Sequence, residues 1–293
     1  MKYKKYNYKN TPDYIQIETN IICNANCDFC TQKKVTRRPS MMEESVWKKI
    51  IDDTRELGIT YRPFLLNEPF TDQRMLDICR YIKQDKTAKV EFNTNGSLLA
   101  PDMANILLDL GVDTVRFSID GVIEEKYNER RKGLDFKTVV KNADYFCKQA
   151  KNYKTYTEVR MIDFPESKDE QKLFVEKWKP LADNVLITSL YSYPWEDQKE
   201  TTYKPCLKIK NEMFFYVDGR ATLCCWDTAE RAVIGDIKEQ KALDIWNGQI
   251  LRQYRDHLDN GSRDKILLCS RCDAYKNVDF EKLQKDDKNY LNT

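Results

Sequence analysis

Three cysteines stand close together near the N-terminus, at Cys23, Cys27 and Cys30, with Phe29 directly before the third. Three thiolates on one short loop can ligate three irons of a cubane cluster and leave the fourth iron free for another ligand. The alternative is half of a four-cysteine zinc site, with Cys27 and Cys30 as its CxxC pair. That alternative gives Cys23 no role, so the spacing favours an iron–sulfur cluster.

A second set of four cysteines lies in the C-terminal third of the chain. Its members are Cys206, Cys224, Cys269 and Cys272. Four thiolates can close an iron–sulfur cluster completely, but tetrahedral zinc accepts the same ligands, so the ligands alone leave both metals open. Among the remaining cysteines, Cys79 and Cys147 fall in predicted helices and are expected to pack there, while Cys225 neighbours a candidate ligand.

Segments typical of strands and of helices alternate through the first two thirds of the sequence. The predicted strands cover 14–20, 59–66, 88–94, 113–120, 156–162 and 184–192. The predicted helices cover 42–57, 72–84, 101–111, 136–150 and 168–182. Six units of this kind predict a parallel sheet, either open or curled into a partial barrel, and the spacing does not choose between the two.

The pattern changes after Pro194. The elements expected there are a polar linker (195–205), a hairpin (212–217 and 220–226) and one helix (241–258). Asp218-Gly219 is a favoured turn pair for the hairpin, and a charged tail follows from Phe280. The predicted domains are an α/β part at 14–193, a small cysteine-rich α+β part at 194–275 and a tail at 276–293.

Polar residues follow several predicted strands at their C-terminal ends. They are Asn67 and Glu68 after the second strand, Thr94 and Asn95 after the third, Ser118 and Asp120 after the fourth, and Arg160 on the fifth. Ligand sites in parallel sheets gather at this edge, so the order of these residues suggests a shared site. Taken singly, Asn95-Gly96 and Asp120-Gly121 are common turn pairs, and Glu68 or Arg160 could be an ordinary ion-pair residue.

On these residues the chain resembles the radical S-adenosylmethionine (SAM) superfamily. The resemblance implies a partial (β/α)6 barrel whose three N-terminal cysteines hold a [4Fe-4S] cluster, with the open iron bound by the amino and carboxylate groups of SAM. An electron from the cluster then splits SAM, and the resulting 5′-deoxyadenosyl radical abstracts hydrogen from the substrate. The implied cofactor-binding residues are Phe29, Asn67, Glu68, Thr94, Asn95, Ser118, Asp120 and Arg160. The glycines that the family usually places before Glu68 are absent here.

The second cysteine set resembles the auxiliary-cluster domain of the same family, in its one-cluster form called twitch rather than the longer SPASM form. The resemblance implies a second [4Fe-4S] cluster on these four cysteines, able to accept an electron from the substrate radical. The spacing is similar to that of a twitch-domain dehydrogenase of aminoglycoside biosynthesis, so the expected reaction is oxidation of a sugar or cyclitol alcohol. Two alternatives stay open. One is a peptide-modifying maturase or epimerase, although only 13 residues precede the first predicted strand. The other is a zinc-stabilised binding protein without catalysis.

Composition narrows the remaining classes. Lys and Arg (49) nearly balance Asp and Glu (47), so the net charge of +2 predicts neither nucleic acid nor an anionic membrane as partner. The chain lacks a phosphate-binding glycine loop, and its single histidine, His257, argues against imidazole-based catalysis. The expected partners are a small-molecule substrate, such as a carbohydrate, or a short peptide, together with a flavodoxin- or ferredoxin-type electron donor.

The expected location is the cytoplasm. No apolar run approaches the roughly 20 residues of a membrane helix, and the N-terminus lacks the apolar core of a secretory signal. In that reducing compartment, ten cysteines imply metal binding, catalysis or packing rather than disulfides.

Overall fold

The computed structural model describes residues 8–190, 206–270 and 272. Its strands are β1 (Tyr14–Ile17), β2 (Thr60–Arg62), β3 (Lys89–Thr94), β4 (Thr114–Ser118), β5 (Tyr156–Asp163), β6 (Asn184–Ser189), β7 (Glu212–Phe215), β8 (Arg220–Thr222) and β9 (Val233–Asp236). Its α-helices are α1 (Glu44–Asp52), α2 (Met75–Ile82), α3 (Pro101–Asp109), α4 (Glu124–Arg130), α5 (Phe136–Ala150), α6 (Lys168–Trp178), α7 (Leu207–Asn211), α8 (Ala242–Trp246) and α9 (Gln249–Asp259). Short 3₁₀ helices are η1 (Thr31–Lys34), η2 (Pro69–Thr71), η3 (Pro165–Ser167) and η4 (Arg263–Lys265).

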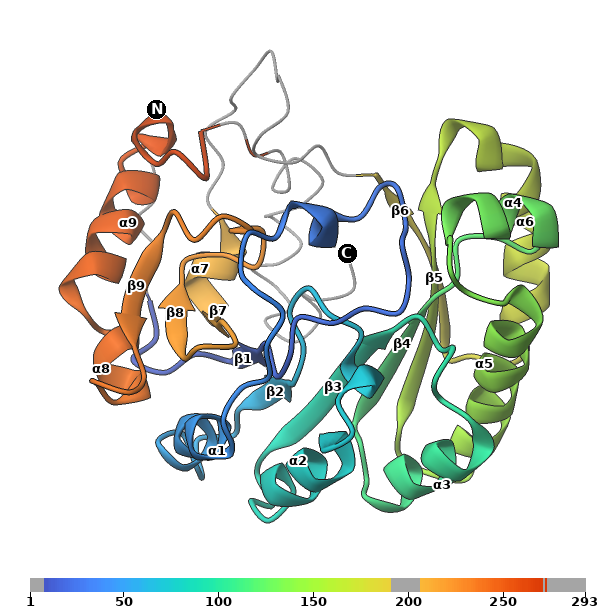
Figure 1. Ribbon diagram of the computed structural model, residues 1–293, viewed down its shortest axis with the longest axis horizontal. Coiled ribbons are helices and arrows are strands. Elements are labelled where there is room, and N and C mark those ends of the chain that lie inside the picture. Colours follow the sequence, from blue (N-terminus) through green and yellow to red (C-terminus); the bar gives the residue numbers. More distant parts are fainter. Residues whose placement is uncertain (1–7, 191–205, 271, 273–293) are drawn as a thin grey trace.

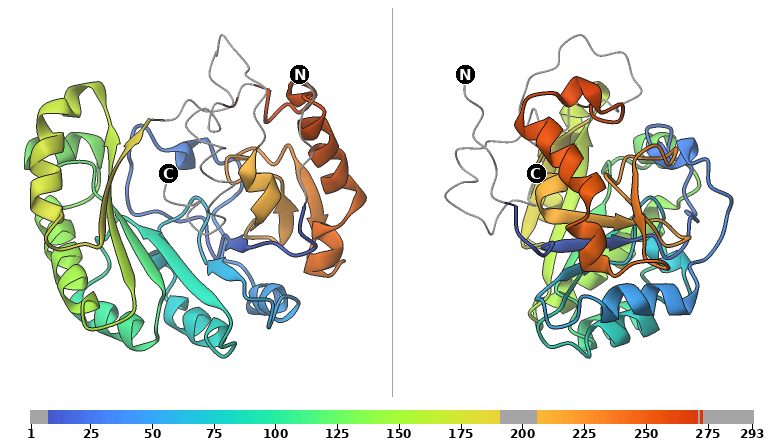
Figure 2. Two further views of the ribbon diagram at one scale, coloured as in Figure 1. Left: turned by 180° about the vertical axis from the view of Figure 1, so that it is seen from behind. Right: turned by 90° about the vertical axis from the view of Figure 1, so that its left-hand side faces the viewer.

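The described strands form one curved sheet in the order β6-β5-β4-β3-β2-β1-β7-β8-β9. The first six strands are parallel to their neighbours, as helical crossovers require. Figures 1 and 2 show helices α1 to α6 along the outer side of the curved sheet. Strands β7 to β9 extend the sheet beyond β1, at the edge opposite β6. The predicted partial parallel barrel with a small α+β part after it is confirmed.

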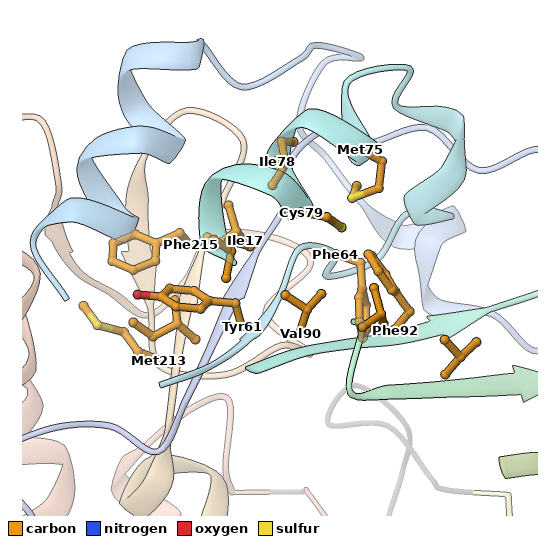
Figure 3. Close-up of a cluster of buried hydrophobic side chains, with 14 of the residues drawn as sticks. Ile17, Tyr61, Phe64, Met75, Ile78, Cys79, Val90, Phe92, Met213 and Phe215 are labelled. Atoms are coloured by element: carbon orange, nitrogen blue, oxygen red, sulfur yellow. The ribbon is translucent and has the colours of Figure 1, made fainter. Parts of the chain in front are cut away.

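The outer face of the sheet is apolar and packs against the helices. Fully buried strand residues on this face include Ile15, Ile17, Tyr61, Val90, Phe92, Val115, Phe117, Val159 and Met161. Figure 3 shows Ile78 and Cys79 of α2 above Val90 of β3. Cys79 and Cys147 are both completely buried, which confirms that they are packing residues. Each large apolar side chain buried in this way contributes about 1.5–3 kcal/mol to stability.

Local chemistry sets several element boundaries. Helix α5 begins and ends where predicted, and the Asp135 side chain caps it by accepting from Thr138 N–H at 2.8 Å. The second strand is shorter than predicted and ends at Arg62, because Pro63 has no N–H for the ladder. Helix α4 was not predicted from the sequence.

The C-terminal part joins the barrel through its own first strand. Strand β7 pairs in parallel with β1, so the sheet continues across the predicted domain boundary, which itself stays a prediction. The predicted hairpin is confirmed: β7 and β8 are antiparallel, and Gly219 takes a φ of 94° in the turn between them. Strand β9, not predicted, pairs with β8.

The single helix predicted over 241–258 is wrong. Two helices, α8 and α9, fill this range, and Gly248 lies between them in extended conformation (φ −69°, ψ 159°). A Cβ at Gly248 would lie 3.0 Å from Asp244 O, so this close approach favours glycine. The predicted linker at 195–205 and the tail from Phe280 lie outside the described residues. No described helix has the length and apolarity to cross a bilayer.

Candidate functional site

The loop after β1 carries the first cysteine set. Cys27 is buried, and Cys23 and Cys30 are partly buried. Backbone N–H groups donate to two sulfurs: Ala25 to Cys23 Sγ at 3.5 Å, and Gln32 to Cys30 Sγ at 3.4 Å. Burial raises the pKa of Cys23 to about 11 and also raises the pKa of Cys27. These thiols therefore need a bound cation to become thiolates at neutral pH.

Side chains from the end of β3 hold this loop on one side. Asn95 Nδ2 donates to Asn24 Oδ1 at 2.9 Å, and Asn24 Nδ2 donates to Ser97 Oγ at 2.8 Å. Ser97 Oγ donates back to Asn95 Oδ1 at 2.7 Å, which closes a ring of three hydrogen bonds. The ring fixes the cysteine loop to the C-terminal edge of the sheet.

The segment after α4 holds the same loop on the other side. Asn26 N–H donates to Lys132 O at 2.7 Å, and Asp28 forms ion pairs with Lys33 at 2.7 Å and with Lys132. A Cβ at Gly133 would come within 3.2 Å of a carbonyl oxygen of the cysteine loop, so only glycine allows this close approach without a shift. The loop is therefore clamped between β3 and this segment.

Arg131 is a site residue that the sequence analysis missed. Its Nε donates to Asp120 Oδ2 at 2.7 Å, and its guanidinium lies 5.3 Å from the centroid of the Phe29 ring. It also hydrogen-bonds the Cys27 side chain and opposes the effect of burial on that thiol's pKa. The Phe29 ring contacts Phe164, just after β5, with 5.1 Å between centroids. The surrounding run EEKYNERRK is typical of an exposed helix, so only its position after the strand-end Asp-Gly pair signals this role.

Two of the predicted strand-end pairs meet at Glu68. Its buried carboxylate accepts from Thr94 Oγ1 at 2.6 Å and from Asn95 N–H at 2.8 Å, and it caps η2 through Phe70 N–H at 3.5 Å. Burial raises the pKa of Glu68 to about 7 against the opposite effect of these hydrogen bonds. Its charge also acts on Cys23, so the carboxylate lies near the first cysteine set. An acceptor held in this way suits a cationic amino group.

Two other predicted cofactor residues have protein partners. Asn67 Nδ2 donates to Asn20 Oδ1 at 3.2 Å, and its Oδ1 accepts from Leu65 N–H at 3.0 Å. Asp120 is buried and, besides its pair with Arg131, accepts from Ile162 N–H at 2.7 Å. The side chains of Asn67 and Asp120 are therefore held in place beside the first cysteine set by hydrogen bonds to other protein groups.

Ser118 and Arg160 stand opposite each other on β4 and β5. The Arg160 guanidinium pairs with Glu158 on the same strand, and burial lowers its pKa. Glu158 also accepts from Asn184 Nδ2, on β6, at 2.7 Å. Arg160 is therefore part of a larger charged network on the inner face of the sheet.

This network crosses the inner face from β6 to β7, and we call it the polar belt. Its members are Gln16, Arg62, Glu91, Arg116, Glu158, Arg160, Asn184 and Glu212. Arg62 lies between two of its carboxylates, 2.9 Å from Glu91 and 3.4 Å from Glu212. Arg116 approaches Glu91 at 2.9 Å and Glu158 at 3.7 Å. The sequence analysis missed the belt, whose only signal is a charge at alternating positions of otherwise apolar strands.

The second cysteine set comes from three separate segments. Cys206 precedes α7, Cys224 follows β8, and Cys272 N–H donates to Cys269 O at 3.3 Å in a turn. A hydrogen bond with Cys225 raises the pKa of Cys224, and burial raises that of Cys269. The charge of Cys206 adds to both shifts, and that of Cys272 adds to the second. Cys206 therefore acts electrostatically on Cys224 and on Cys269, and Cys272 acts on Cys269.

Both cysteine sets suit iron–sulfur ligation by their donor chemistry. In the part of the chain that the structure describes, no group of three or more Cys, His, Asp or Glu side chains is close enough to hold a metal ion as placed. The sulfurs do accept backbone N–H groups, at Cys23, at Cys30 and at Cys224, the last from Trp226 at 3.5 Å. Such bonds tune cluster-bound thiolates, and clustered thiol donors favour soft metal centres.

Arg37 connects the two regions. It pairs with Glu18 at 2.8 Å, and its guanidinium lies 4.1 Å from the centroid of the buried Tyr216 ring at the end of β7. The preceding Thr36 N–H donates to Thr228 O at 3.2 Å. The chain that leaves the first cysteine set is therefore fixed to the loop that carries Cys224. The sequence analysis missed this contact because its partners lie far apart in the chain.

Comparison with known families decides between the metals and chemistries that such sites allow. Residues 17–176 match the radical SAM superfamily. This chain belongs to that superfamily. Residues 206–273 match SPASM, an iron–sulfur cluster-binding domain. The protein is a radical SAM enzyme, and its cofactors are SAM and iron–sulfur clusters.

Both named sequence relatives and solved structures are similar to this chain. The S-adenosyl-L-methionine-dependent 2-deoxy-scyllo-inosamine dehydrogenase of Niallia circulans is 21% identical over 265 residues, covering 88% of this chain and 91% of that protein. The crystal structure of BtrN in complex with AdoMet and 2-DOIA has a TM-score of 0.65 at 18% identity and covers 92% of this chain and 94% of its own. The crystal structure of Streptococcus suis SuiB bound to precursor peptide SuiA has a TM-score of 0.64 at 14% identity. The match covers 85% of this chain and 67% of the SuiB chain. Three other curated relatives are 26–33% identical, but this chain spans only 30–60% of their length.

Proposed function

We propose that this radical SAM enzyme dehydrogenates a secondary alcohol of a sugar or cyclitol. One observation carries the proposal: the likeness to the Niallia circulans dehydrogenase extends over 88% of this chain and 91% of that protein, so it spans the barrel and reaches into the auxiliary part. The solved structure of BtrN covers both chains to a similar extent. Likeness of fold alone does not fix a substrate, so the substrate class needs the experiment below.

The proposal gives each cysteine set one cluster. Cys23, Cys27 and Cys30 would hold the first, and Cys206, Cys224, Cys269 and Cys272 the second. When bound, the first cluster and SAM supply a radical that abstracts a hydrogen atom. Within the protein, Glu68 would bind the amino group of SAM, and Thr94 and Asn95 would orient Glu68 through the hydrogen bonds at 2.6 and 2.8 Å. The other residues proposed to bind SAM are Phe29, Asn67, Ser118, Asp120 and Arg160.

The proposed reaction removes two hydrogens from the substrate. The 5′-deoxyadenosyl radical would take the carbon-bound hydrogen atom, a base would take the hydroxyl proton, and the cluster held by Cys206, Cys224, Cys269 and Cys272 would accept the remaining electron. The products are a ketone and 5′-deoxyadenosine. A cluster closed by four thiolates suits the electron-acceptor role, because it keeps no open iron at which a substrate could bind.

The polar belt supports a polar substrate. Six of its eight members are more than nine-tenths buried, so the inner face presents fixed charged and polar groups rather than an apolar surface. Arg160 has a side chain that is 21% exposed, and it lies opposite Ser118, the last residue of β4. Hydroxyl or amino groups of a substrate would match such an inner face.

Peptide modification is the second candidate. SuiB, a structure solved with its precursor peptide, matches this fold with a TM-score close to that of BtrN. This chain covers only 67% of SuiB, however, against 94% of BtrN. The better mutual coverage favours the alcohol dehydrogenase. Membership of the radical SAM superfamily argues against the zinc-stabilised binding protein without catalysis.

The deciding experiment uses anaerobically purified and reconstituted enzyme with SAM and dithionite. Two cubane clusters predict about eight irons per chain. Sugar alcohols and aminocyclitols deuterated at the carbinol carbon should transfer deuterium to 5′-deoxyadenosine and yield a ketone that hydroxylamine traps. Because peptide crosslinking also removes two hydrogens, the trapped ketone separates the two candidates. Deuterium transfer without a ketone would refute dehydrogenation. A colourless protein that contains zinc would support the alternative of a zinc-stabilised binding protein without catalysis.

The proposal also includes a location and a redox partner. Ten cysteines outside disulfides suit the reducing cytoplasm, and cluster reduction there needs a low-potential donor such as a flavodoxin or a ferredoxin.

A further inference from the structure

We infer that residues 33–38, together with Met41, form the docking surface for an acidic one-electron carrier protein. This inference rests on the proposed function, because a radical SAM cluster needs electrons from outside. The segment contains Lys33, Lys34, Arg37 and Arg38, and no Asp or Glu occurs anywhere between residues 29 and 42. The whole chain carries only +2, so the rest of it carries a net charge of −2.

The side chains of this segment divide into one inward and three outward cations. Arg37 is turned inward to Glu18 and has a side chain only 4% exposed. Lys33, Lys34 and Arg38 are exposed. Lys33 forms an ion pair with Asp28, whereas Lys34 and Arg38 form no ion pair or side-chain hydrogen bond with a residue that the structure describes. Two exposed cations thus remain available to a partner.

The segment is held as a rigid support rather than as a free loop. Its first part is η1, which begins directly after Cys30 and has Cys30 as its N-cap. Its second part is fixed by the bond from Thr36 to Thr228 and by the Arg37–Glu18 pair. Side chains on a fixed support lose little entropy when a partner binds, which favours a specific docking site.

The position suits electron delivery to the first cluster. Cys30, a proposed cluster ligand, is three residues before Lys33, and at the 3₁₀ rise of about 2 Å per residue their backbones are ~6 Å apart. Met41 adds an exposed apolar residue beside the cations: it is 49% exposed, and its backbone bridges to Asn20, three residues after β1. Small interfaces with an apolar centre and a charged rim are typical of transient electron-transfer complexes.

The positive charge of this segment indicates which kind of partner binds there. A cationic segment beside a redox centre, on a chain that is otherwise slightly acidic, would steer an acidic carrier to this side of the molecule. Flavodoxins of strongly negative net charge are such carriers. Steering of this kind raises association rates by about 10- to 1,000-fold at low salt and weakens as salt is added.

The test compares two double variants of the full-length, reconstituted enzyme. Lys34→Gln with Arg38→Gln removes two unpaired cations of the segment. Lys172→Gln with Lys179→Gln removes two exposed cations at α6 and serves as the control matched in charge. Binding of an oxidised acidic flavodoxin is measured without turnover, at low and at high salt, and 5′-deoxyadenosine formation is then measured with reduced flavodoxin and with dithionite.

We expect at least about tenfold weaker flavodoxin binding for the segment variant at low salt, a flat salt dependence, and no change for the control. Flavodoxin-driven turnover should fall in parallel, while dithionite-driven turnover stays at the wild-type rate. Equal binding by both variants would overturn the inference, and so would an equal loss with both reductants. If wild-type enzyme cleaves no SAM even with dithionite, the proposed function fails, but the binding comparison still decides the docking surface.

Discussion

The two cysteine regions are built in opposite ways. The first places its three thiols within eight residues, and side chains from β3, from the segment after α4 and from beyond β5 clamp that loop. The second draws its four thiols from three segments, with 44 residues between Cys224 and Cys269. A short clamped loop keeps its shape through protein contacts, whereas distant segments need a shared ligand to bring them together. We therefore expect the first cysteine loop to keep its shape without metal, and the four thiols of the second set to be brought together by metal binding.

The sharpest way to separate the regions is to delete the first set. Cys23, Cys27 and Cys30 changed together to alanine should reduce 5′-deoxyadenosine formation to the rate without enzyme, because no thiolate remains to hold the reducing cluster. About four irons per chain should remain on the second set. Cys79→Ala, at a buried packing thiol, is the control and should keep both cleavage and all of the iron. Residual SAM cleavage by the triple variant would contradict the assignment.

Deleting one thiol of the second set should have a different result. We expect Cys269→Ala to cleave SAM but to form no ketone, because the substrate radical then has no electron acceptor. Hydrogen exchange should rise strongly over residues 206–270, while the amides of the first cysteine loop change little, since protein contacts hold that loop. The same contrast should appear when a chelator strips the iron from wild-type enzyme. Equal loosening of both regions would refute the proposed difference.

The same contrast explains what the sequence could predict. The first cysteine loop, α5 at 136–150 and the meeting of Glu68 with Thr94 and Asn95 depend on local spacing or on the shared edge of a parallel sheet. The contacts of Arg131 and Arg37 could not be predicted, because each joins segments distant in the chain, and an arginine among other charges has no periodic signal. The break at Gly248 was missed because the apolar pattern continues through it.

The clamp on the first loop can be weakened at Arg131. Its side chain is only 12% exposed and pairs with Asp120, so Arg131→Met leaves a buried carboxylate without its partner. Breaking a buried pair in this way costs about 3 kcal/mol or more, measured as a shift of the urea unfolding midpoint. The first cluster should also be lost faster on exposure to a chelator. Lys137→Met, at a residue outside the clamp with 77% of its side chain exposed, should change both measurements little.

The smallest predicted effect depends on pH at Glu68. Burial raises its pKa from 4.5 to about 7, so the folded protein keeps this proton over a range in which the unfolded chain has lost it. The protonated group therefore stabilises the fold below pH 4.5, and this contribution is lost as pH rises through about 7. Binding of a cationic amino group has the opposite sign, because it requires the carboxylate.

Affinity for SAM should consequently rise with pH below about 7, approaching tenfold per unit where Glu68 is mostly protonated. Glu68→Gln should bind SAM more weakly and lose this slope, because the amide does not titrate. Isothermal titration calorimetry between about pH 5.5 and 7 measures the affinity for SAM and its slope with pH, with the first cluster assembled in each protein. Asn67→Asp, one residue earlier, is the matched control: it adds a carboxylate outside the contacts of Thr94 and Asn95, so the slope due to Glu68 should remain. A slope that survives in Glu68→Gln would assign the titration to another group and remove Glu68 from the amino-group site.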